Sequence, residues 1–537
     1  MIKKIFSSQS KTVIGAAVIL GLASFVSRLI GIMRDRIFAH QFGAGDVLDA
    51  YYAAFRIPDL IYNLIIVGAL SAGFIPIFTK LLVKDKPEAW RVANSVFNIL
   101  GIILTVICSV LFIFTPSLMH LITPGFDAEK IKLTSTLARI MFLSPILLGL
   151  SGIVSSILQS FKNFLVYSLT PIFYNLGIII GAWLFVPKFG VAGLAYGVIL
   201  GTLLHLLIQL PSLYKNGFKY QPLFLWTNTY VKQIGKLMIP RTLSLAVSQF
   251  NLLFITILAS TLASGSVTIF NFANNLQYFP VGIIGVSFAI AAFPTLSQLI
   301  AENKKDAMIE QLSSTIRQII FFIIPLTIIF LLLRAQITRV VLGSGEFDWN
   351  DTILTANTLA LFSLSLFAQC LIPLLSRAFY SIHDTWTPFF TALIGMAVNV
   401  ISAFYFKNLF GISGLALSFS FAVTIQLILT WILLKRKLGS LNETYILKSL
   451  AKISLATILM GITIQLLKYP LANFVDMTRF WGILLQGAIS GIIGLLIYGI
   501  ILHFLKLEEM QQFSQSLRRQ WLKLWNIQGE IKEGDEI

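Results

Sequence analysis

The chain has 537 residues, of which 57% are hydrophobic and only 12% are charged. Its mean hydropathy is +0.85. Soluble domains carry about 25% charged residues, so this composition excludes a string of soluble domains. The apolar runs are long and continuous, unlike the alternating strands of a membrane β-barrel. A membrane-spanning helix needs about 20 apolar residues. The sequence therefore predicts an all-α polytopic membrane protein.

The charge balance is strongly positive, with 40 Lys and Arg against 23 Asp and Glu, a formal net charge of +17. In membrane proteins such an excess collects in cytoplasmic loops, and we therefore expect no nucleic-acid partner. Cys108 and Cys370 lie in apolar runs, and the five histidines are scattered without a metal-ligand spacing. The sequence predicts no metal site and no cofactor.

Hydrophobic runs separated by polar or Pro/Gly breaks predict about fourteen membrane-spanning helices. We interpret the first run as an uncleaved helix rather than a signal peptide, because it continues directly into Ser27 and Arg28 without a cleavage site. With an even number of spans and the N-terminus inside, most Lys and Arg fall on the cytoplasmic side, so both termini are expected to be cytoplasmic. The expected spans lie near 13–40, 48–80, 91–115, 132–158, 164–186, 190–214, 231–261, 267–299, 312–334, 352–379, 386–406, 411–434, 446–468 and 480–505.

An internal repeat divides the chain. The run Phe189–Ala195 recurs as Phe410–Ala416, and Thr170-Pro171 recurs at nearly the same offset as Thr387-Pro388. Parallel six-helix repeats of this kind characterise several transporter folds. We therefore expect two six-helix lobes plus two extra C-terminal helices, followed by an amphipathic tail on the membrane surface. The predicted parts are an N-lobe at 1–225, a C-lobe at 226–440, a helix pair at 441–510 and a cytoplasmic tail at 511–537.

Several charged residues lie inside these spans, where each costs about 2.5–3.5 kcal/mol at the bilayer centre unless it faces water or a partner. In the second span Asp49, Arg56 and Asn63 share one helical face with Tyr52 and Asp59. Arginines outnumber acids, so a cavity formed by these residues would suit an anionic, phosphate-bearing substrate. The charged set is Arg28, Arg34, Asp35, Arg36, Asp49, Arg56, Asp59 and Arg241.

These residues also carry a resemblance to a known family. The runs Ser27–Asp35, Phe42–Gly45 and Phe55–Leu60, with Gly265–Val267 and Phe279–Val286, resemble the signature of the MurJ/MviN family. The resemblance implies the MOP transporter fold, with two lobes around a cationic cavity. It also implies a transporter, not an enzyme, that flips lipid II, an undecaprenyl-pyrophosphate-linked muropeptide, across the bacterial inner membrane. Membrane lipids and a coupling ion or the membrane potential are the other expected partners.

The resemblance also suggests site residues. The expected substrate contacts are Arg28, Arg34, Asp49, Arg56, Arg241 and Asn275, and the expected supporting residues are Ser27, Asp35 and Asn63. The chain departs from the family pattern at Asn274-Asn275, where many members have an acidic–Arg pair, and at Tyr62-Asn63, where some relatives have arginines. Arg241 is therefore a candidate for the missing cation, and we expect Arg28, Arg34 and Arg241 to neutralise a pyrophosphate together.

Other functions remain open at this stage. The chain can instead be a flippase for another polyprenyl-linked oligosaccharide or a MATE-like drug exporter on the same fold. A polyprenyl-phosphate glycosyltransferase is disfavoured because the loops are too short for a nucleotide-sugar site, and a scaffold is disfavoured by the cost of the buried charges. The last two spans, rich in Leu, Ile and Gly, are expected to form an apolar groove for a polyprenyl tail, with Leu484 and Ile493 among its residues.

Overall fold

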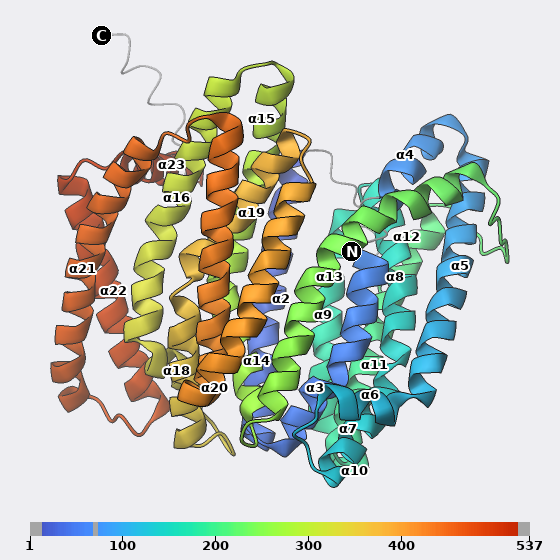
Figure 1. Cartoon of the computed structure of the whole chain (residues 1–537), viewed down its shortest axis with the longest axis horizontal. Helices are drawn as coiled ribbons and strands as arrows, with labels where there is room; N and C mark the ends of the chain where they lie inside the picture. The colour runs from blue at the N-terminus through green and yellow to red at the C-terminus, as the bar shows by residue number, and fades with distance from the viewer. Residues whose placement is uncertain (1–12, 68–72, 525–537) are drawn as a thin grey trace. The chain divides into compact units, whose positions relative to one another are not determined.

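The computed structural model describes residues 13–67 and 73–524, and within these residues all regular secondary structure is helical (Figure 1). The first half contains α2 (Val13–Phe42), α3 (Asp46–Ile61), the π-helical turn η1 (Tyr62–Val67), α4 (Ile75–Lys84), α5 (Lys86–Ile113), α6 (Thr115–Ile122), α7 (Ala128–Met141), α8 (Leu143–Ser160), α9 (Phe164–Ile180), η3 (Gly181–Phe185), α10 (Val186–Phe189), α11 (Ala192–Leu207) and α12 (Leu210–Lys215).

The second half is built in the same way from long helices with short breaks. It contains α13 (Thr229–Ser260), α14 (Ser266–Pro280), η4 (Val281–Gly285), α15 (Val286–Ala301), α16 (Lys305–Leu332), α17 (Arg334–Leu342), α18 (Trp349–Ser363), α19 (Leu366–Ser381), α20 (Trp386–Leu438), α21 (Glu443–Phe474), α22 (Phe480–Phe504) and α23 (Glu508–Leu524).

Nine helical segments among the described residues are long and apolar enough to cross a membrane. A tenth is added if α18 and α19, which meet at a bend of 44°, form one span. The prediction of an all-helical polytopic membrane protein is therefore confirmed. The expected spans near 13–40, 48–80 and 231–261 are not in this set, and each contains residues or side chains outside the described part. The count of fourteen stays a prediction.

Two copies of the repeated motif have the same local geometry. Gly190 and Gly411 have φ angles of 60° and 56°, a left-handed conformation that favours glycine. Three residues later, a Cβ atom on Gly193 or on Gly414 would lie within 2.4 Å of backbone atoms of the preceding helical turn. The glycines therefore break the helix in the same way at both sites, and α20 is two helices joined at Gly411.

The chain forms two compact units. Unit 1 comprises Met1–Leu276, Val341–Thr358 and Ala392–Phe419, and unit 2 comprises Gln277–Val340, Leu359–Thr391 and Ser420–Ile537. These units follow spatial contacts, so the four-part division predicted from the repeat stays a prediction.

In unit 1, α9 and α11 pack backbone against backbone. A Cβ atom on Gly177 would lie 2.2 Å from the Cα of Gly201, and one on Gly181 would lie 2.3 Å from the Cα of Gly197. Small residues permit such close approach of membrane helices. Unit 2 is centred on an apolar core to which α15, α16, α19 and α21 contribute, with Leu312, Ile316 and Leu374 fully buried.

Candidate functional site

Arg34 and Asp35 on α2 are the centre of a polar cluster inside unit 1. The Nη2 and Nε atoms of Arg34 both donate to Oδ1 of Asp35, at 2.8 and 3.0 Å, and its Nη1 donates to Oδ1 of Asn175 on α9 at 3.1 Å. Asp35 is buried, and its Oδ2 accepts a bond of 2.9 Å from Nδ2 of Asn275 on α14. The cluster therefore joins α2, α9 and α14, and it brings together three residues that the sequence analysis had selected.

Arg56 on α3 makes a second polar contact with α13 and α14. Its Nε donates to Oγ1 of Thr256 at 2.7 Å, and its Nη2 donates to Oδ1 of Asn271 at 2.8 Å. The Asn271 amide is oriented by its own bond of 2.6 Å to the Val267 carbonyl. Both acceptors of Arg56 are neutral, so these two bonds hold the guanidinium without cancelling its charge.

Asp49 lies in a third cluster, at the beginning of α14. Its side chain is buried and accepts from the Gly265 N–H, from the N–H and Oγ1 of Thr268, and from Nζ of Lys130, at 2.8 to 2.9 Å. The carboxylate thus satisfies the free amides of a helix N-terminus, as an N-cap side chain does. Both Asp49 oxygens hold α14 and Lys130 in this structure, and the expected contact of Asp49 with substrate stays a prediction.

Three loops meet beside this third cluster: the loop after α2, the loop before α14 and the loop before α18. Gly265 has φ +85°, and a Cβ on it would lie 2.1 Å from the Ala44 carbonyl oxygen. Oδ2 of Asp351 accepts from the Ala44 N–H at 2.9 Å, and the Glu346 N–H donates to the His40 carbonyl at 3.0 Å. The sequence analysis did not select Asp351. Glycines in the left-handed conformation mark these close contacts, but their φ angles are not visible in sequence.

The remaining selected residues are placed as follows. Ser27 and Arg28 are partly buried on α2. Nδ2 of Asn63 donates to the Asp59 carbonyl at 2.9 Å, a local bond one turn away. Arg241 lies on α13, and its side chain is outside the described part of the structure. Its expected pairing with Arg28 and Arg34 therefore stays a prediction.

The side chains that the site brings together are charged and amide groups. Among the described residues, no group of three or more His, Cys, Asp or Glu side chains is arranged to hold a metal ion. What unit 1 provides is guanidinium and amide groups held by hydrogen bonds between helices. Such intramembrane charges mark the pathways of transported substrates.

The fold and these buried charges define a polytopic helical transporter. The family model described as "Lipid II flippase MurJ" matches residues 38–485. The chain therefore belongs to the MurJ lipid II flippase family, as its motifs had predicted. The motif at Ser27–Asp35 precedes the matched residues.

Curated relatives agree with this assignment. The chain is 33% identical over 440 residues to the probable lipid II flippase MurJ of Buchnera aphidicola subsp. Acyrthosiphon pisum, covering 79% of this chain and 84% of that one. It is 28% identical to the lipid II flippase MurJ of Burkholderia cenocepacia over 423 residues, covering 77% of this chain and 82% of that one.

Solved structures show the same fold. A lipid II flippase MurJ in an inward closed conformation superposes with a TM-score of 0.77 at 27% identity, covering 91% of this chain and all of that one. A multidrug resistance MATE family transporter of the MOP superfamily, inward-facing, superposes with a TM-score of 0.68 at 18% identity, covering 80% of this chain and 99% of that one. The second likeness concerns the fold alone.

Proposed function

We propose that this chain translocates lipid II across the bacterial cytoplasmic membrane by alternating access around a cationic cavity. Membership of the MurJ family over residues 38–485 is the observation that carries this proposal. The partly buried guanidinium groups of Arg34 and Arg56 support it, because the pyrophosphate of lipid II is an anion that must pass through the apolar layer.

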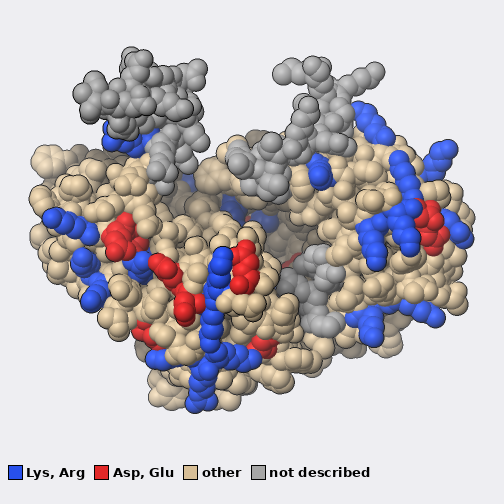
Figure 2. All heavy atoms as spheres, turned by 90° about the horizontal axis from the view of Figure 1, so that it is seen from above, with Lys and Arg blue, Asp and Glu red and all other residues tan. Residues whose placement is uncertain are grey.

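The proposed architecture has fourteen spans, in two parallel six-helix lobes at 1–225 and 226–440, a helix pair at 441–510 and a tail at 511–537. The matching geometry at Gly190 and Gly411 supports the repeat. Both termini are proposed to be cytoplasmic. In support, exposed Lys and Arg gather on the face that carries the adjoining ends of α4 and α5 (Figures 1 and 2).

The proposed headgroup contacts are Arg28, Arg34, Asp49, Arg56, Arg241 and Asn275. A planar guanidinium binds two phosphate oxygens at once, which suits it to a pyrophosphate. In this structure Arg34 donates hydrogen bonds to Asp35 and Asn175. When substrate binds, Arg34 would give up these bonds and donate to phosphate oxygens instead. Asp49 stays among the proposed headgroup contacts, and Ser27, Asp35 and Asn63 support the site.

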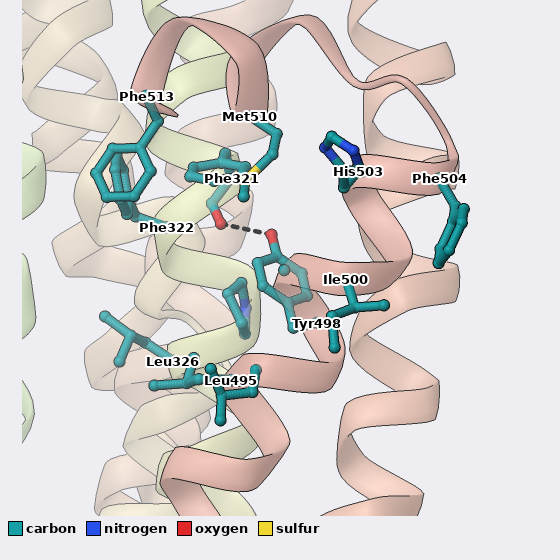
Figure 3. A pocket seen from close by; sticks show the side chains of 13 residues that line it. Phe321, Phe322, Leu326, Leu495, Tyr498, Ile500, His503, Phe504, Met510 and Phe513 are labelled. Atoms are coloured by element: carbon teal, nitrogen blue, oxygen red, sulfur yellow. Dashed lines mark hydrogen bonds between the residues drawn. The ribbon is translucent and has the colours of Figure 1, made fainter. Parts of the chain in front are cut away.

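For the polyprenyl tail we propose an apolar pocket in unit 2. It has a volume of about 810 Å³ and lies among α16, α22 and α23 (Figure 3). Phe321, Phe322 and Phe513 line one side, and the Tyr498 hydroxyl donates to the Phe321 carbonyl at 2.7 Å, so the only phenol group in the lining has a partner. The pocket uses Leu495–Phe504 of α22 rather than the expected Leu484 and Ile493.

The proposal is tested in cells depleted of their own lipid II flippase. Expression of this chain should restore growth and restore the appearance of lipid II on the outer face of the membrane, measured by its accessibility to an externally added reagent. The chain's presence in the membrane is confirmed by immunoblot. Normal membrane expression without any outward movement of lipid II would overturn the proposal and favour another polyprenyl-linked substrate.

A further inference from the structure

The segment that connects α12 to α13 has no regular secondary structure and lies along α5, where Figure 1 shows it beside the helix. Three polar residues of α5 hold it. Asn94 donates to the Lys219 carbonyl at 3.0 Å and accepts from the Gln221 N–H at 2.8 Å. Asn98 donates to the Gln221 carbonyl at 2.8 Å, and Oγ of Ser95 accepts from the Leu225 N–H at 2.8 Å. All three side chains are buried, so the segment is built into the fold.

This attachment leaves a row of aromatic rings exposed. Phe218 is buried, whereas Tyr220, Phe224 and Trp226 are 58%, 44% and 52% exposed. The Tyr220 ring packs against Phe97 of α5, with centroids 6.3 Å apart. Amphipathic rings such as Tyr and Trp concentrate at the interface between membrane and water.

Next to the Tyr220 and Phe224 rings is a groove of about 320 Å³ between α5 and α8. Its walls include Ile102 and Val106 of α5 and Ile146 and Leu150 of α8, and Tyr220 and Phe224 also line it. Gly101 keeps it open, because a Cβ there would lie 3.3 Å from the Leu150 side chain. These walls belong to helices of membrane-spanning length and hydropathy, so the groove faces hydrocarbon.

The same end of unit 1 is rich in positive charge. Lys219 immediately precedes Tyr220, and Arg91 lies seven residues before Asn98, on the same face of α5. Both are exposed. Further lysines near the ends of α4, α5, α12 and α13 are exposed, and Figure 2 shows that blue side chains gather on this side of the molecule. They are Lys80, Lys84, Lys86, Lys215, Lys232 and Lys236.

We propose that this groove binds one anionic glycerophospholipid of the leaflet on that side of the membrane. An acyl chain occupies the space between α5 and α8, and the phosphate lies at Lys219 and Arg91, beside the exposed aromatic rings. The pattern of an apolar groove, an aromatic level and a cationic level along one helix face matches the pattern of such a lipid from tail to head. This site is separate from the proposed path of lipid II, and its test does not depend on flipping.

The test is photocrosslinking of the full-length protein in vesicles, with Ile102→p-benzoylphenylalanine as the probe inside the groove. The vesicles contain phosphatidylglycerol and phosphatidylcholine with identical acyl chains in equal amounts, and mass spectrometry measures the two adducts. The phosphatidylglycerol adduct should dominate. Removing both cations with Lys219→Gln and Arg91→Gln should lower this preference by about 25-fold, since each cation near the surface adds about 1 kcal/mol, a factor of about five, for anionic lipid.

The matched control carries Lys80→Gln and Lys84→Gln, which remove the same charge from the same end of unit 1 without touching the groove. It should keep the preference. Equal adducts of the two lipids at Ile102, or an equal loss in the control, would show ordinary contact with bulk lipid and overturn the proposal. A protein adduct between two copies of the chain in place of a lipid adduct would also overturn it.

Discussion

Oδ1 of Asp49 accepts hydrogen bonds from both the backbone N–H and the hydroxyl of Thr268, each at 2.8 Å. Thr268 is in the first turn of α14, so a carboxylate from α3 caps a helix that begins more than two hundred residues later. Anionic groups are stabilised at helix N-termini by the free amides and by the helix dipole. This contact explains why a charge is retained at a fully enclosed position of α3.

Removing this carboxylate should destabilise the protein strongly. Asp49→Ala leaves the α14 amides without their acceptor and takes from the buried Lys130 ammonium its buried carboxylate partner, at a cost of about 3–5 kcal/mol. Asp46 is the other acid paired with Lys130, and its side chain is 61% exposed. Asp46→Asn should therefore cost at most about 1 kcal/mol. Thermal unfolding of the purified variants in detergent distinguishes the two. Equal unfolding temperatures for Asp49→Ala and the unchanged chain would contradict this account.

Arg34 should be sensitive to shape as well as to charge. Its guanidinium makes bonds to Asp35 and Asn175 from different nitrogen atoms, and a lysine ammonium does not reproduce this fork. Complementation of a flippase-depleted strain should be impaired by Arg34→Lys and more so by Arg34→Ala, at normal membrane expression. Arg479→Ala, an exposed arginine paired only locally with Asp476, is the control and should complement fully. Full growth with Arg34→Ala would remove this residue from the proposed site.

The close contact at Gly265 should not tolerate a methyl group. Gly265→Ala places a Cβ 2.1 Å from the Ala44 carbonyl oxygen in addition to the strain of φ +85°. Gly217→Ala has a similar φ of +95° but meets nothing within 4 Å, so it measures the backbone strain alone, about 1–2 kcal/mol. The unfolding temperature should fall further for Gly265→Ala than for Gly217→Ala. Equal effects would mean that the two loops do not touch.

The proposed topology predicts the side from which single cysteines react. With the buried Cys108 and Cys370 replaced by Ala, a cysteine at the exposed Lys84 should be labelled only from the cytoplasmic side by a membrane-impermeant maleimide. A cysteine at the exposed Asp127 should be labelled only from outside. Labelling both after membrane disruption controls for reactivity. The reverse pattern would overturn the orientation of the helices between them.

Asp384, in the loop before α20, should contribute to stability over a wide pH range. Burial alone would raise the pKa of this carboxyl, but hydrogen bonds from Lys437 and Thr387 lower it to about 2. A lowered pKa stabilises the folded state above the ordinary value near 4, and the contribution is lost as the pH falls toward 2. The stability difference between the unchanged chain and Asp384→Asn should therefore be constant from pH 7 to about pH 5 and shrink below about pH 4. A difference that shrinks already near pH 6 would contradict this.

The sequence predicted what depends on local pattern. Apolar runs indicated the membrane helices, and the cost of burying Arg34, Asp35 and Arg56 indicated that they would meet polar partners. Their partners were not predictable in detail, because Asn175 and Asn271 are unremarkable amides far away in the chain.

The role of Lys130 was not predicted either. It lies just before the span expected near 132–158, where a lysine is typical of a solvent-exposed loop. Only the fold brings it to Asp49. The π-helical turns η1, η3 and η4 have no sequence signature either, since they arise where packing forces an extra residue into a helical turn.

The glycine contact between α9 and α11 has a genetic consequence. A Cβ on Gly177 would strike the backbone of Gly201, and Cβ atoms on Gly181 and Gly197 would strike each other's backbone, while a Cβ on Gly201 would lie 2.4 Å from the Tyr174 carbonyl oxygen. In each case the nearest atom is backbone. The steric clash of a larger residue on one helix cannot be removed by substituting a smaller residue on the other helix. Revertants of a mutation at any of these four codons should therefore be true back-mutations, or changes elsewhere that move a whole helix, and not second changes at the facing position.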